Sequence, residues 1–279
     1  MSNLFNGLES MGLQGLENVK IYDEEPKNTD KQEEKPKTPE VKEADYLFDK
    51  TFKCPVCEKE FKAKMVRAGK TRLIGSDSDL RPKYSGIDSI KYDAVVCPHC
   101  GYASLSRFFG NLTEGQIKLI TGAVTANFKG MPEYGDIYTY DEAINRLKLV
   151  LLSTIVKKGK NSEKAYTCLK LAWVYRGLAE HLTETGELTK EKEKLCKDSE
   201  DEMLKNALEG FVAARQGENF PVCGMDESTL DYLIADIAAR TGKFDLAEQM
   251  ISSVVVSRSA NTRLKDKART LRDSIKARK

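Results

Sequence analysis

The fold of the N-terminal half is decided by FKCPVCEKEF (residues 52–61) and VVCPHCGYA (residues 95–103). Each segment holds one Cys-x-x-Cys pair, and together they supply Cys54, Cys57, Cys97 and Cys100. Two residues between paired cysteines let a tight turn direct both sulfurs at one point, and two such turns complete a tetrahedron around a metal ion. The four cysteines are therefore predicted to bind one structural Zn²⁺ ion.

Other interpretations of these cysteines are weaker. A redox-active Cys-x-x-Cys usually stands singly at the start of a helix in a βαβ unit, a context not visible here. His99 lies between two cysteines and is interpreted as a turn residue, because four sulfurs already fill the shell. The 39 residues between Cys57 and Cys97 exceed the gap of a minimal zinc ribbon and predict an inserted hairpin.

The surroundings of the cysteines are basic. Residues 50–91 hold eleven Lys and Arg against five Asp and Glu, which would suit contacts with nucleic-acid phosphates or a solvated surface that balances the thiolates. The segment SDSDLRPKY brings together Asp77, Asp79 and Arg81. The two carboxylates are either acid–base groups or ion-pair partners of the arginine. No histidine or nucleophile accompanies them, which favours the structural interpretation.

Two segments precede this region. Residues 23–45 hold nine acidic and five basic side chains, three prolines and no aromatic residue, which predicts a disordered charged linker. Residues 1–22 form a short apolar N-terminal segment, interpreted either as a frayed tail or as a docking peptide on a tether. Its large apolar side chains at helical spacing are Leu4, Phe5, Leu8 and Met11.

Secondary-structure signals change near residue 111. Residues 46–110 are rich in turns, and short strands are expected in EFKAKMVR, TRLIG and KYDAVV. Residues 111–279 show helical periodicity instead. The sequence therefore predicts an α+β protein, with a small zinc-ribbon-like β-rich domain over residues 46–110 and an all-α helical-hairpin domain over residues 111–279.

The helical half contains related segments. YTYDEAINRLKLVLL (residues 138–152) and GKFDLAEQMISSVV (residues 242–255) both place an aromatic–Asp pair before a small alanine, as in the second helix of a tetratricopeptide repeat. A further hairpin is expected around Ala172 and Ala207, with residues 183–200 as a charged extension between its helices. Irregular spacing indicates degenerate repeats, stacked into a short solenoid with a concave binding surface. The alternative is a non-repeating helical bundle.

Composition limits the class of protein. The chain has 279 residues with a net charge of +2, which excludes a nucleic-acid polycation. No apolar run approaches the roughly 20 residues of a membrane helix, and the N-terminus lacks the pattern of a secretory signal. Seven cysteines without an export signal are typical of a reducing cytoplasm. Glycine-rich phosphate loops, HExxH and GxSxG are missing from the sequence, which disfavours an enzyme.

Four blocks in order carry a resemblance to a known family: FKCPVCEKEF, SDSDLRPKY, YDAVVCPHCGYAS and FPVCGMDESTLDYLIADIAARTGKFDLA. Over about residues 46–257, the chain resembles the uncharacterised bacterial family named domain of unknown function 2225. The resemblance implies a bacterial cytoplasmic protein with a four-cysteine ribbon and helical repeats, but it carries no established reaction.

The combined prediction is a non-enzymatic zinc-binding interaction scaffold that binds a protein partner through its helical repeats. One alternative is a nucleic-acid-associated protein that uses the basic face of the ribbon. The other is an enzyme with a site between the ribbon and the helical domain.

Overall fold

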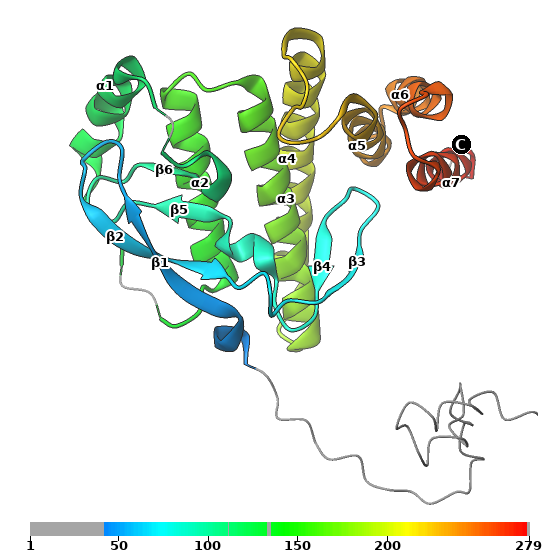
Figure 1. Cartoon of the computed structure of the whole chain (residues 1–279). Coiled ribbons are helices and arrows are strands. Elements are labelled where there is room, and N and C mark those ends of the chain that lie inside the picture. The colour runs from blue at the N-terminus through cyan, green and yellow to red at the C-terminus, as the bar shows by residue number, and fades with distance from the viewer. Residues whose placement is uncertain (1–41, 111, 133–134, 278–279) are drawn as a thin grey trace, which may run out of the picture. The chain divides into compact units, whose positions relative to one another are not determined.

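The structure, a computed structural model, describes residues 42–110, 112–132 and 135–277 (Figure 1). Within the described residues, the N-terminal part contains three two-stranded antiparallel sheets. They pair β1 (Leu47–Lys53) with β2 (Glu60–Val66), β3 (Leu73–Ser76) with β4 (Pro82–Tyr84), and β5 (Ala94–Val96) with β6 (Ala103–Leu105). The β3–β4 hairpin lies between the two cysteine pairs, which confirms the predicted insertion.

Seven α-helices follow in the described residues, so the predicted α+β class is confirmed. They are α1 (Glu114–Ala123), α2 (Tyr140–Val156), α3 (Asn161–Glu184), α4 (Lys190–Gly217), α5 (Glu227–Arg240), α6 (Phe244–Val256) and α7 (Thr262–Lys276). Five begin at a side chain that accepts a hydrogen bond from a backbone N–H of the first turn, which satisfies a donor left free by the helix. These N-caps are Thr113, Thr139, Thr189, Asp226 and Asn261.

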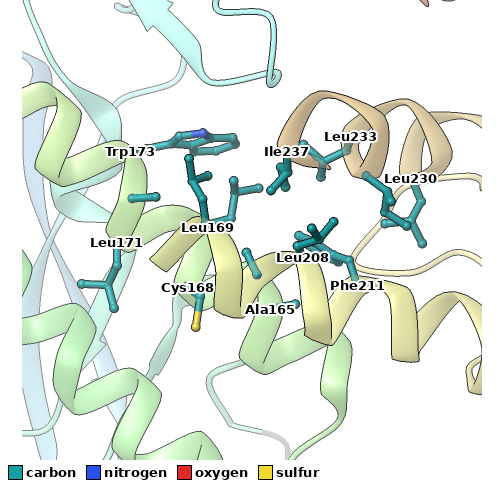
Figure 2. Close-up of a cluster of buried hydrophobic side chains, with 14 of the residues drawn as sticks. Ala165, Cys168, Leu169, Leu171, Trp173, Leu208, Phe211, Leu230, Leu233 and Ile237 are labelled. Carbon is teal, nitrogen blue, oxygen red and sulfur yellow. The ribbon is translucent and has the colours of Figure 1, made fainter. Parts of the chain in front are cut away.

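Helices adjacent in the chain pack against each other from α2 through to α7. Figure 2 shows the centre of this packing, where Trp173 and Leu169 of α3 lie near side chains of α4 and α5. The labelled partners are Leu208 and Phe211 of α4 and Leu230, Leu233 and Ile237 of α5. Trp173 is 3% exposed and lies in the core between these helices. The tetratricopeptide-like character of these helices stays a prediction.

The small β5–β6 sheet belongs to two apolar clusters at once. Ala94 and Val96 pack into the main helical core. Val95, between them, packs into a second cluster with the cysteines. Alternation along a strand sends neighbouring side chains to opposite faces, so this hairpin is a shared wall between the two clusters. The boundary expected at residue 110 separates two kinds of secondary structure but not two independent cores.

Two expectations about charged segments need correction. Residues 190–200 are the first turns of α4 and not an extension between helices, and Cys196 within them is buried. Glu200 anchors this part of α4 through an ion pair with Arg176 of α3 at 2.7 Å. The end of the predicted linker is also ordered, because η2 (Glu43–Tyr46) is a 3₁₀ helix whose Glu43 accepts a hydrogen bond from the Tyr92 hydroxyl. Residues 1–41, which comprise the N-terminal segment and most of the linker, lie outside the described residues.

Candidate metal centre

Two turns with the same backbone pattern carry the four cysteines. In the first, between β1 and β2, the N–H of Cys54 donates to the Lys59 carbonyl at 3.0 Å and the N–H of Glu58 to the Cys54 carbonyl at 2.9 Å. In the second, between β5 and β6, the corresponding bonds run from Cys97 to the Tyr102 carbonyl at 2.8 Å and from Gly101 to the Cys97 carbonyl at 3.0 Å. The two strand ends thus present their sulfurs in the same way.

Each turn closes with a residue in the left-handed conformation. Glu58 has φ 59° and Gly101 has φ 76°. At Gly101 a side chain would also collide with its surroundings, because a Cβ atom there would lie 2.5 Å from the Phe128 ring. Glu58 takes the same conformation at a cost of about 1 kcal/mol. Glycine is therefore required in the second turn, where Phe128 covers it.

The four sulfurs converge on one point. All four lie within 4.8 Å of one another. Cys54 and Cys100 have their sulfurs 3.6 Å apart, and Cys57 and Cys97 are separated by the same distance. A tetrahedral Zn²⁺ ion with bonds of about 2.3 Å would separate its sulfurs by about 3.8 Å, so this cluster has the size of such a shell. Among the described residues, these cysteines form the one cluster that could hold a metal ion.

Protonation of the cluster is strongly uneven. The pKa of Cys54 is lowered, because its sulfur is hydrogen-bonded with the Cys100 and Cys97 sulfurs. The pKa of Cys100 is raised far above its ordinary value by that same bond to Cys54. One thiolate therefore forms readily, while further ionisation adds negative charge to a buried group. A dication would offset this charge and let all four sulfurs act as thiolates.

The other cysteines are separate from this cluster. Burial raises the pKa of Cys168 to about 11 and that of Cys223 to about 11. Burial also raises the pKa of Cys196, which is 3% exposed. High pKa values keep these thiols protonated at neutral pH, so they are poor nucleophiles and poor metal ligands.

Asp79 is the centre of an ion-pair network between the β3–β4 connection and α3. Its carboxylate has no solvent exposure and accepts hydrogen bonds from Arg176 at 2.6 Å and from the Trp173 indole N–H at 3.0 Å. Burial alone would raise the pKa of Asp79, but the bonds and charge of Arg176 lower it overall. The carboxylate is thus held ionised by helix side chains and has no access to a substrate.

Arg81 and Asp77 extend the same network. Arg81 is 4% exposed and binds Asp88 at 3.1 Å and Glu180 at 3.0 Å. Asp77 approaches Arg81 only at 3.8 Å and pairs more closely with Arg176, at 3.0 Å. The structure brings these three predicted residues together, as an anchor for the hairpin on α3. The main partner of Asp79 is an arginine far along the chain, which local sequence does not indicate.

Comparison with known families identifies the chain. A family described as an uncharacterised protein conserved in bacteria, DUF2225, matches residues 47–275. The chain belongs to DUF2225. No curated protein and no solved structure matches it. No helix in the described residues of this DUF2225 protein has the length and apolar character needed to cross a membrane.

A polar pocket of about 620 Å³ lies between β4, residues 86–91, the start of α2 and the end of α3. Its arginine and its two lysines already have acidic partners. Lys91 pairs with Glu43 at 2.7 Å, and Arg81 pairs with Asp88. A basic side chain whose charge is already neutralised attracts a charged substrate only weakly. The enzyme interpretation therefore gains no support from this pocket.

The same pairing reduces the basic patch predicted over residues 50–91. Lys83 binds Asp77 at 3.1 Å, and Lys64 lies 3.7 Å from Asp49. Together with the pairing of Arg81 and Lys91, these contacts leave fewer free cations for phosphates than the sequence count indicates.

A second hollow, of about 1050 Å³, is the groove bounded by α4, α5, α7 and residues 76–78. Leu204, Ala239 and Leu271 contribute apolar atoms to it. Charged and hydroxyl side chains line its walls. Sequence analysis predicts a concave surface on the helical half, but it does not name these residues, because three helices and a distant loop contribute them.

Proposed function

We propose that this DUF2225 protein is a non-enzymatic interaction scaffold. A structural Zn²⁺ ion braces its β-rich end, and the helical half binds a protein partner. The observation that carries the proposal is the position of its two prominent features: the closed sulfur cluster lies between the β1–β2 and β5–β6 turns, and the groove lies among α4, α5 and α7. Binding and bracing are therefore tasks of different residues.

Zinc is the metal that these ligands fit best. Four cysteine sulfurs at tetrahedral spacing are typical of structural zinc sites, which keep no open position for a water or a substrate. The N–H of Val56 points at the Cys54 sulfur at 3.4 Å, a contact that stabilises a metal-bound thiolate. When bound, the ion would join the β1–β2 and β5–β6 turns and contribute to folding free energy.

Metal analysis of the chain tests the zinc brace. Protein purified under reducing conditions is expected to carry one Zn²⁺ per chain. Cys97→Ser is expected to abolish stoichiometric binding and to lower the melting temperature. Cys223→Ser is the matched control, because a serine there can still donate to the Ser162 carbonyl that the thiol now contacts. A folded chain with almost no metal and four titratable thiols would refute the brace.

Affinity capture tests the scaffold. The tagged chain, captured from its bacterial host with nuclease present, is expected to retain a protein that also binds when both components are purified. Recovery of RNA or DNA alone, lost on nuclease treatment, would replace this proposal with the nucleic-acid function. The zinc brace would survive that outcome, since metal content is measured independently.

A further inference from the structure

The charges of the groove between α4, α5 and α7 are unevenly paired. Its lining includes the cations Lys197, Arg263 and Lys267, and within the described chain none of the three forms an ion pair. Lys267 has a hydrogen bond to the Ser76 hydroxyl at 3.3 Å, which leaves its charge uncompensated. Arg263 and Lys267 are four residues apart and so share one face of α7, while Lys197 lies on α4.

Most of the carboxylates that line the groove already have basic partners. Glu200 binds Arg176 at 2.7 Å, and Asp236 binds Arg240 at 2.7 Å. Asp77 and Asp266 are likewise paired, with Lys83 and Arg269. Asp201 is the one lining carboxylate without an ion pair among the described residues. Among the described side chains that line the groove, three cations and one anion therefore have no ion-pair partner.

We infer that this groove binds an acidic peptide segment of a partner protein, with carboxylates placed against Arg263 and Lys267. The inference rests on the proposed scaffold function and specifies the partner's chemistry. Apolar atoms of Leu204, Ala239 and Leu271 suit apolar side chains of the peptide that lie between its carboxylates. A nucleic acid fits less well, because its phosphates are continuous and would meet the lining carboxylates, whereas a peptide can vary its charge along its length.

Fluorescence anisotropy with the full chain tests this inference. The probes are labelled synthetic peptides of equal length: one of Glu and Leu, one with each Glu replaced by Gln, and one with each Glu replaced by Lys. A labelled single-stranded oligonucleotide is the fourth probe. The Glu peptide is expected to bind most tightly, and its affinity is expected to fall as salt rises, since salt screens exposed charges.

Variants locate the site. Arg263→Glu with Lys267→Glu is expected to weaken binding of the Glu peptide about tenfold or more. The matched control, Lys265→Glu with Lys276→Glu, reverses two charges on the same helix that do not line the groove. It is expected to change the affinity less than about twofold. Asp201→Asn removes the free carboxylate and is expected to tighten binding, a gain that misfolding does not produce.

The outcomes separate the inference from the function on which it rests. Equal binding of the Gln and Glu peptides, both displaced by the captured partner, would overturn the acidic preference and leave the scaffold standing. Equal losses in the two charge-reversed variants would place binding elsewhere and overturn the inference. Binding of the oligonucleotide alone, abolished by reversal of Arg263 and Lys267, would overturn the inference and the scaffold together.

Discussion

Replacing Asp79 by asparagine tests whether the buried ion pair holds the β3–β4 connection on α3. The change keeps the side chain's volume but removes its charge and puts an amide N–H₂ among groups that all donate. Loss of one partner of a buried pair costs about 3–5 kcal/mol of unfolding free energy. Arg176 keeps its bonds to Asp77 and Glu200, so we expect a loss of about 3 kcal/mol, at the lower end of that range.

The ion-pair network contains the residue that serves as its fluorescent reporter. Trp173 is the single tryptophan of the chain and donates its indole N–H to Asp79. Urea unfolding followed by tryptophan fluorescence therefore reports on the affected region. Asp266→Asn is the control, because its pair with Arg269 is exposed, at 60% and 56%, and should contribute less than about 0.5 kcal/mol. Equal stability of the Asp79→Asn and Asp266→Asn chains would refute the assigned role of Asp79.

Two further predictions concern stability. Gly177→Ala in α3 would place a Cβ atom 2.7 Å from Asp88 Oδ2 and 2.8 Å from Tyr140. This variant should lower the unfolding free energy by about 1–3 kcal/mol. Gly122→Ala in α1, which has open space around it, should raise the unfolding free energy by up to about 1 kcal/mol. Urea unfolding of both variants measures the contrast. The pKa of Asp79 is lowered in the folded chain, so its contribution should be complete above the unfolded-state pKa of about 3.9 and disappear as pH falls through the lower folded-state pKa. Unfolding free energies across the acid range should therefore decline less steeply in Asp79→Asn, and parallel declines would contradict this linkage.

Local sequence was sufficient for the features that depend on near neighbours. Each Cys-x-x-Cys pair specifies its own turn, so the cluster of Cys54, Cys57, Cys97 and Cys100 was predictable. The last helix was predictable as well, because Ala268 and Ile275 recur at helical spacing and are fully buried. The helix and each cysteine turn form within a few residues of their signal. The meeting of the two turns, with Cys57 and Cys97 40 positions apart, was predicted because a metal ion needs four ligands.

Non-local features were not predictable in the same way. Strand β1 lacks clear alternation, and residue-by-residue pairing with β2 defines it instead. The pair between Asp79 and Arg176 joins residues 97 positions apart. The start of α4 is rich in charge and looks like a solvated connection, but its burial of Cys196 and the Glu200–Arg176 contact fix it as helix. Such contacts exist only once distant segments have come together.

The shared wall formed by β5 and β6 limits how this architecture can be divided or recombined. Ala94 and Ala103 face the helices, and Val95 and Tyr102 face the cysteines, all with 2% exposure or less. A zinc-binding end transplanted without its helices would expose the apolar face of the β5–β6 hairpin that the helices now cover. Helices transplanted alone would lose the hairpin that covers one side of their core. The β-rich end is consequently not an exchangeable module. Its fold depends on the helices that cover it, and a substitution on either face of the wall disturbs a hairpin that both cores share.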